Sequence, residues 1–311
     1  MDRIAQALER ARSEGESAAT ESWKPEMTRP LSDLPEKGGR QEPVFLDATT
    51  EPTTSGRSGI QYTQTRTLAA NPESMRLHRV VTDAADERSV NAYRMLGTQV
   101  IQKMRERKWS TLAVTSAASS EGKTLTAVNL AISLGREVDS TVLLVDANIR
   151  APEIHTFFGW SSLPGLSDYL TADVPLQSLL VHPGFGRLVV LPGGTALQKS
   201  SEWLGSQKMM QLVRELKARY PARLVVFDLP PVLSTADALA CAPWVDAVLL
   251  VVEECATQQE ELRSTVQMLD STNIIGTVLN KSRQSVDPDN QKPVERARPA
   301  KRSFFSRFKR G

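Results

Sequence analysis

One short segment carries the residue types that bind a phosphate chain. Residues 116–124 read SAASSEGKT and lie between a strand-like segment, WSTLAVT, and an apolar segment with helical spacing that ends at Gly135. In this order, loop N–H groups and the first helical turn face a bound anion, the Lys123 amine reaches the outer phosphates and the Thr124 hydroxyl ligates Mg²⁺. The segment therefore predicts a phosphate loop that binds a magnesium nucleotide.

The general phosphate-loop pattern begins with a glycine, but Ala117 occupies that position here. The backbone at Ala117 must therefore avoid positive φ. A chance Gly-Lys-Thr at a helix start is the alternative interpretation, and the strand-loop-helix order disfavours it. The residues expected to surround the nucleotide are Ala118, Ser119, Ser120, Glu121, Gly122, Lys123, Thr124 and Leu125.

Two carboxylates follow apolar segments that are typical of strands. Asp146 follows TVLLV, and Asp228 follows LVVF and precedes two prolines. The carboxyl ends of parallel strands form the edge where ligands bind, so both side chains are expected to face the phosphate loop. Together with the Thr124 hydroxyl they would provide oxygen ligands for Mg²⁺. Taken singly, each aspartate fits a helix cap or a turn equally well.

The elements that must position these residues alternate between strands and helices. Helical segments are expected at residues 125–134 and 202–220. Strands with few polar alternates belong to a parallel sheet covered by helices on both faces, so the fold class is α/β, doubly wound and mainly parallel. The expected strands are residues 111–115, 141–145, 188–191, 224–227, 247–252 and 274–279.

Composition divides the chain into four parts. Residues 1–15 have the spacing of a short amphipathic helix, and residues 16–85 are rich in proline and predict a flexible linker. Residues 86–283 form the predicted nucleotide-binding domain, and residues 284–311 form a basic, disordered tail.

Overall composition excludes several classes of protein. With 40% hydrophobic residues in 311, the chain is not wholly disordered. Its apolar runs are too short to span a bilayer, and its first residues lack a signal peptide, so a cytoplasmic location is expected. The only cysteines, Cys241 and Cys255, are interpreted as small buried apolar residues.

The end of the chain is basic. From Lys281 onward there are ten Lys and Arg against three Asp and Glu, and the last residues, KRSFFSRFKRG, interleave phenylalanines with cations. Residues 301–311 could bind an anionic membrane surface. Nucleic-acid binding and a merely solvated tail are the alternatives.

Three segments together resemble the bacterial tyrosine kinases and their CpsD/CapB-type relatives in polysaccharide assembly. They are SAASSEGKT, VLLVDANIRAP at residues 142–152 and LVVFDLPPVLSTADA at residues 224–238. The resemblance spans residues 85 to 283 and implies a phosphate-loop NTPase fold of the SIMIBI type. The opening IAQALERAR also resembles the exosortase-associated subgroup of this family.

The resemblance implies roles for individual residues. Lys123 would hold the phosphates, and Asp146 would bind the metal or help activate the acceptor. Arg150 would steady the phosphates or the acidic motif, Asp228 would hold Mg²⁺ through water, and Asn280 would read the base. The implied cofactors are ATP and Mg²⁺, and the implied chemistry is phosphoryl transfer.

The resemblance also implies a biological setting. It indicates an ATP-binding tyrosine autokinase in exopolysaccharide biosynthesis and export, at the inner face of the plasma membrane. Its expected partner is a membrane co-polymerase that determines chain length, a homo-oligomer is possible, and no specific nucleic acid is expected. One alternative is a catalytically weak nucleotide switch or scaffold of the same machine. The other, a partitioning or cell-division ATPase, is disfavoured because its extra loop lysine would stand at Ala118.

The chain departs from the family pattern at several sites. Asn148 replaces the second acid of the D-x-D-x-R motif, so weaker metal binding or slower transfer is expected. No tyrosine lies beyond Tyr220, where the family carries a tyrosine cluster, and Tyr62 is the candidate acceptor. Further departures are Ser119 and Ser120 in place of Pro-Gly, Leu229 after the strand-end acid, and Asn91, Arg94 and Gly97 in the helix that would form rings.

Overall fold

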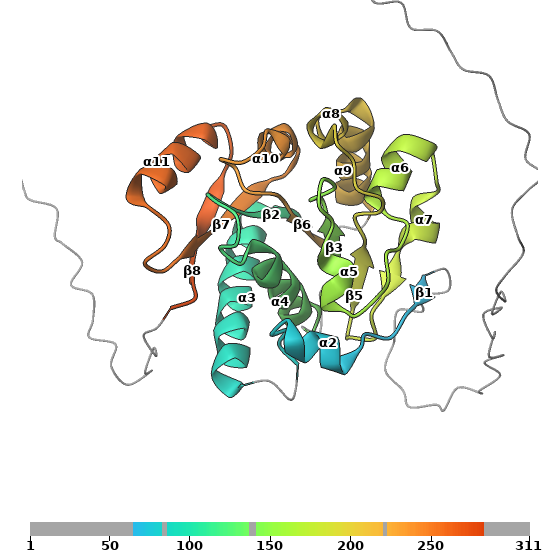
Figure 1. The fold of residues 1–311 in the computed structure, drawn as a ribbon, viewed down its shortest axis with the longest axis horizontal. Helices are drawn as coiled ribbons and strands as arrows, with labels where there is room; N and C mark the ends of the chain where they lie inside the picture. The colour runs from blue at the N-terminus through green and yellow to red at the C-terminus, as the bar shows by residue number, and fades with distance from the viewer. Residues whose placement is uncertain (1–64, 83–85, 137–140, 220–222, 283–311) are drawn as a thin grey trace, which may run out of the picture. The chain divides into compact units, whose positions relative to one another are not determined.

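A mostly parallel sheet of eight strands forms the centre of the computed structural model, which describes residues 65–82, 86–136, 141–219 and 223–282 (Figure 1). The strand order is β1-β4-β5-β3-β6-β2-β7-β8, and the one antiparallel pair among the described strands is β4 with β5. The strands are β1 (Arg66–Thr67), β2 (Thr111–Ser116), β3 (Thr141–Asp146), β4 (Val181–His182), β5 (Leu188–Leu191), β6 (Arg223–Asp228), β7 (Ala247–Glu253) and β8 (Ile274–Asn280).

The strands at the centre of the sheet are buried on both faces. Every residue of β2 and β5 is buried, and β3 and β6 are buried from their second residue onward. Such strands require cover on both sides, which is why their sequences show apolar runs instead of alternation. The six expected strands and the α/β fold class are confirmed, whereas β1 and β4 were not expected, because two residues give no sequence pattern.

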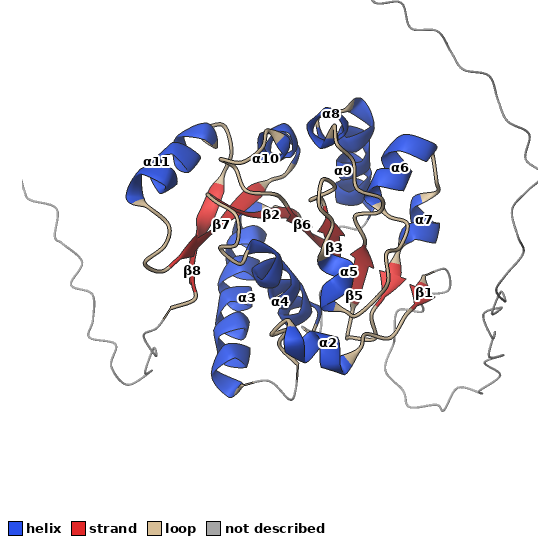
Figure 2. Cartoon of the chain, viewed as in Figure 1, coloured by secondary structure: helices blue, strands red, loops and turns tan. Residues whose placement is uncertain are grey.

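Helices cover both faces of the sheet (Figure 2). One core contains side chains of α2 (Pro72–Leu77), α3 (Glu87–Arg107), α4 (Lys123–Gly135) and α5 (Ile154–Phe157). The other core contains side chains of α6 (Leu166–Ala172), α7 (Leu176–Leu179), α8 (Ser200–Leu204), α9 (Gln207–Arg219) and α10 (Asp237–Cys241). A 3₁₀ turn (Ala242–Trp244) follows α10, and α11 (Gln259–Met268) precedes β8.

The predicted helix at residues 202–220 is wrong as a continuous element. The structure ends α8 at Leu204, and α9 begins at Gln207. Gly205 closes the first helix, and the Ser206 hydroxyl accepts a hydrogen bond from the Met209 N–H at 3.2 Å. The glycine and the serine thus interrupt an apolar pattern that alone suggested one helix.

The predicted linker, residues 16–85, is wrong over residues 65–82. This segment pairs β1 with β4 and buries Met75 of α2, which is 1% exposed. Asn71 caps α2 by accepting hydrogen bonds from the N–H groups of Glu73 and Ser74. The folded unit therefore begins before residue 86. The predicted helix at 1–15, the rest of the linker with Tyr62, and the tail at 284–311 lie outside the described residues.

The two cysteines differ in their surroundings. Cys241 is buried, and this burial raises the pKa of its thiol to about 12. Cys255 is exposed, which corrects the expectation of a buried residue: it lies in the turn after β7 with φ of 60°. Among the described helices, none is both long and apolar enough to cross a membrane.

Candidate active site

The phosphate loop connects the buried strand β2 to the amino end of α4. Gly122 directly precedes the helix with φ of 89°, a conformation that favours glycine. A Cβ atom at this position would lie 2.0 Å from Asn280 Nδ2. Ala117 is buried and is not among the described residues with positive φ, so the expectation for its backbone is confirmed.

Lys123, Thr124 and Asp228 converge beneath the loop. The Lys123 amine donates a hydrogen bond to Thr124 Oγ1 at 2.8 Å, and that hydroxyl donates to Asp228 Oδ2 at 2.8 Å. The Lys123 amine also lies 3.7 Å from Asp228 Oδ1. Because β2 and β6 are adjacent and parallel, their carboxyl ends bring together residues from distant parts of the chain.

Asp146 lies beside Asp228 at the same edge of the sheet. The two residues are register partners on β3 and β6. Burial, and second to it the neighbouring charge of Asp228, together raise the pKa of Asp146 to about 7. Burial also raises the pKa of Asp228, whereas the Lys123 charge opposes that change. A bound cation would favour the charged forms of both carboxyls.

The donor set fits a magnesium nucleotide. Asp228 Oδ1 is buried and accepts no hydrogen bond from the described residues, so this oxygen is left for a further partner. The Thr124 hydroxyl lies against the same carboxylate. Oxygen donors of these types are those that Mg²⁺ prefers. No group of three His, Cys, Asp or Glu side chains suited to a metal occurs in the described part of the chain.

Asp146 is held mainly by backbone groups. Its Oδ2 accepts hydrogen bonds from the N–H groups of Glu153 and Ile154, both at 3.0 Å, and its Oδ1 accepts one from the Asn148 N–H at 3.2 Å. A Cβ at Gly193 would lie 3.1 Å from Asp146 Cγ, so this glycine permits the loop after β5 to approach the carboxyl. Asp146 therefore closes its own turn as well as facing Asp228.

Arg150 contacts a carboxylate that sequence reasoning missed. Its Nε lies 3.5 Å from Asp237 Oδ2, and its side chain remains 41% exposed. Asp237 is fully buried at the start of α10 and accepts a hydrogen bond from the Ser200 hydroxyl at 2.6 Å. The sequence signal that could have found it is the motif STADA, which places Asp237 nine residues after Asp228. The structure thus pairs Arg150 with Asp237 and not, by hydrogen bond or ion pair, with Asp146.

Two departures from the family pattern have local structural roles. Asn148 is buried, and its Nδ2 donates to the Ala151 carbonyl at 2.9 Å. Leu229 is fully buried in the second core. The predicted base-reading residue, Asn280, donates through Nδ2 to the Glu121 carbonyl at 2.9 Å, which places it directly beside the phosphate loop.

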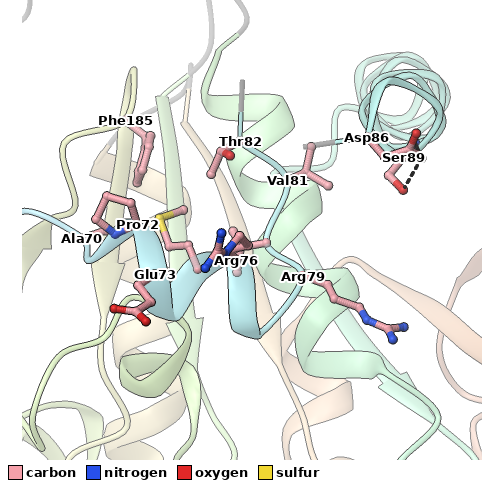
Figure 3. A pocket seen from close by; sticks show the side chains of 12 residues that line it. Ala70, Pro72, Glu73, Arg76, Arg79, Val81, Thr82, Asp86, Ser89 and Phe185 are labelled. Atoms are coloured by element: carbon pink, nitrogen blue, oxygen red, sulfur yellow. Dashed lines mark hydrogen bonds between the residues drawn. The ribbon is translucent and has the colours of Figure 1, made fainter. Parts of the chain in front are cut away.

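A cavity of about 970 Å³ lies elsewhere, beside α2 (Figure 3). Its lining includes the buried Met75, the cations Arg76 and Arg79, and Phe185. None of the predicted site residues lines it. The site is therefore defined by the convergence of side chains at the carboxyl edge of the sheet and not by this cavity.

Fold and site define a class: a nucleotide-binding domain with a phosphate loop between a parallel strand and a helix. The tyrosine-protein kinase YwqD of Bacillus subtilis (strain 168) is 30% identical over 209 residues, which cover 66% of this chain and 87% of that protein. The chain belongs to the bacterial tyrosine kinase family. The sequence matches no protein-family model.

Other kinases share this region. The tyrosine-protein kinase etk of Escherichia coli (strain K12) is 30% identical over 220 residues, and the chain spans only 30% of its length. The solved kinase domain of that protein has a TM-score of 0.57 over 63% of this chain and 78% of its own. The solved VpsO kinase domain is 29% identical and has a TM-score of 0.56. The match covers 63% of this chain and 96% of that domain. The predicted exosortase-associated subgroup stays a prediction.

Proposed function

We propose that this chain binds MgATP at residues 118–125 and transfers the γ-phosphoryl group to a tyrosine hydroxyl. The observation that carries the proposal is the convergence of Lys123, Thr124 and Asp228, where a buried Asp228 oxygen accepts no hydrogen bond from the described residues. Membership of the tyrosine kinase family supports the choice of acceptor.

The proposed transfer needs little covalent chemistry from the protein. The tyrosine oxygen forms a bond to the γ-phosphorus, the bond from that phosphorus to the β–γ bridging oxygen breaks, and ADP leaves. Asp146 is the register partner of Asp228, and because a bound cation would keep its carboxyl charged, it is suited to accept the hydroxyl proton. Lys123 neutralises phosphate charge, and bound Mg²⁺ supplies further charge neutralisation and orientation.

The acceptor tyrosine is a separate part of the proposal. Tyr93 and Tyr169 are both half-buried, and no tyrosine follows Tyr220 in the sequence. We therefore propose Tyr62 as the acceptor in this chain, with tyrosines of a partner protein as the other possible substrates. Phosphopeptide mapping distinguishes these cases directly.

The proposed setting follows from the sequence resemblance. The chain would act in the cytoplasm, in exopolysaccharide biosynthesis and export, together with a membrane co-polymerase. The basic residues 301–311 would bring it to the anionic inner face of the plasma membrane. Flotation of the full chain with vesicles containing anionic lipid, compared with neutral vesicles, tests this association.

A second candidate function is a nucleotide-dependent switch with weak catalysis. The observation that favours it is Asn148, whose side chain donates to the Ala151 carbonyl at the position of the motif's second acid. Such a protein would bind nucleotide without efficient transfer.

The first test measures binding and transfer separately. Purified full chain is titrated with MgADP and is also incubated with radiolabelled MgATP, followed by mass spectrometry for phosphotyrosine. We expect both signals in the wild type and neither with Lys123→Ala, because the amine that contacts Thr124 and Asp228 is removed.

Lys103→Ala is the matched control, since Lys103 lies on α3 and donates to the Ile275 carbonyl. It should leave both signals unchanged. Nucleotide binding without phosphotyrosine on the chain or on a supplied tyrosine peptide supports the switch, and absence of binding contradicts both candidates.

A further inference from the structure

The phosphate loop is attached to the ends of β7 and β8 by side chains outside the recognised nucleotide motifs. The Lys281 amine donates a hydrogen bond to the Ser120 carbonyl at 2.8 Å and also lies 2.8 Å from Glu253 Oε2. The Thr257 hydroxyl donates to Glu121 Oε1. Ser120 and Glu121 of the phosphate loop are therefore each hydrogen-bonded to a residue that follows a neighbouring strand, Lys281 after β8 and Thr257 after β7.

Glu121 is a buried carboxylate within a loop that would bind an anion. Its side chain must therefore be held by hydrogen bonds, and Thr257 donates one of them. Glu121 is only 3% exposed, and its Oε2 accepts a hydrogen bond from the Ala118 N–H at 3.0 Å. Thr257 is fixed in turn, because its Oγ1 accepts a hydrogen bond from the Glu253 N–H at 2.9 Å. Hydrogen bonds to both oxygens keep the negative charge in one place.

The backbone conformation of Ser120 is a second feature of the phosphate loop that requires contacts from outside the loop. Its φ is 66°, in the left-handed region that a side-chain-bearing residue adopts at a cost. Ser120 lies in the turn at residues 119–120, directly before Glu121 of the phosphate loop. A serine adopts this φ less readily than a glycine, and the hydrogen bond from Lys281 to the Ser120 carbonyl supports the turn from outside the loop.

We infer that Thr257 and Lys281 are positioning residues for the phosphate loop: they hold the strained turn at Ser120 and the Glu121 carboxylate in the nucleotide-binding conformation. The inference rests on the proposed function for its consequence in nucleotide affinity. The claim that Thr257 and Lys281 hold the loop concerns the unliganded protein and does not depend on that function.

The first experiment titrates the full chain with MgADP by calorimetry. Thr257→Val and Lys281→Met should each raise the dissociation constant about tenfold, because each removes a hydrogen bond to the loop. The controls are Thr272→Val, a similarly half-buried threonine at the opposite end of β8, and Lys103→Met, whose amine also donates to a backbone carbonyl. Both controls should bind MgADP as the wild type does.

Substituting Ser120 by glycine distinguishes a role of Lys281 in positioning the phosphate loop from a role in stabilising the whole fold. Adding Ser120→Gly should reduce the affinity loss caused by Lys281→Met, since glycine adopts positive φ without cost. A loss of affinity that is identical with and without Ser120→Gly, and that follows the unfolding temperature, would overturn the inference.

Hydrogen exchange of the unliganded protein completes the test. Amides of residues 117–124 should exchange faster in Thr257→Val and Lys281→Met than in the wild type or the two controls. Unchanged exchange contradicts the inference even where nucleotide binds. If the wild type fails to bind MgADP but the variants show faster exchange, the proposed function fails and the support of the loop stands.

Discussion

At the residue scale, the site depends on polar groups that are buried together. Asp146 and Asp228 are buried register partners, and among the described residues Lys123 forms an ion pair with Asp228. Burial is the largest cause of the raised pKa of each carboxyl. A site of this kind gains most from a cation, because the cation offsets both the desolvation and the mutual repulsion.

Asn148 gives a prediction at this scale. Asn148→Asp restores the family acid but removes the Nδ2 donor to the Ala151 carbonyl, and it adds a carboxyl near Asp146. We expect the unliganded variant to lose about 1–3 kcal/mol of unfolding free energy. Thermal unfolding without magnesium measures the loss.

Asn273→Asp is the comparison, since Asn273 also donates to a backbone carbonyl but is exposed. Its loss should be smaller. If the new carboxylate at position 148 joins the metal site, MgADP should raise the unfolding temperature of Asn148→Asp more than that of the wild type. Equal stability of wild type and Asn148→Asp without magnesium would contradict the assigned role of the amide.

At the element scale, Asp246 joins three elements at the amino end of the sheet. Its Oδ2 accepts hydrogen bonds from the N–H groups of Ser110 and Thr111 at the start of β2, and its Oδ1 accepts one from Lys217 of α9. Burial alone raises the pKa of Asp246, but these hydrogen bonds outweigh it and hold the pKa below its ordinary value of 3.8.

The predicted effect of Asp246→Asn depends on pH. A lowered pKa means that the unfolded chain binds more protons, so the ionised carboxylate stabilises the fold above pH 3.8 and this contribution is lost as the pH falls through the folded pKa. The variant should therefore be less stable than the wild type at pH 7, with the difference shrinking below about pH 4.

Denaturant unfolding of both proteins across this range checks the prediction. Asp270→Asn, at an exposed position after α11, serves as the control and should differ little from the wild type at either pH. A difference for Asp246→Asn that stays constant with pH would show that the hydrogen bonds do not depend on the charge.

At the scale of the whole molecule, residues 65–82 complete the first core. β1 extends the sheet by pairing with β4, and α2 adds Met75 to the cluster that contains α3 and α4. The Val81 N–H also donates to Asn129 Oδ1 of α4 at 2.8 Å. The kinase fold of this chain thus includes a segment whose composition is typical of a linker.

Two substitutions in α2 test this conclusion. Met75→Ala should cost about 2–5 kcal/mol of unfolding free energy, because it leaves a cavity in the core. Leu77→Ala, on the same helix but 78% exposed, should change stability by about 0.5 kcal/mol or less. Urea denaturation measures both. Similar small effects would mean that α2 contributes nothing to the folded core.

The phosphate loop, six strands and the placement of each aspartate directly after a strand were all predictable from the amino-acid sequence. These features are local, because a loop of fixed order and runs of apolar residues report their own conformation. The family followed from the same segments, and YwqD confirms it.

Contacts between residues that are distant in the sequence became known from the folded chain alone. Thr257 and Glu121 are separated by 136 positions, and Arg150 and Asp237 by 87. The two-residue strands β1 and β4 are stabilised by pairing and not by their own pattern. The contacts of Thr257 with Glu121 and of Arg150 with Asp237 arise because parallel strands bring their carboxyl ends together, and no spacing along the sequence encodes them.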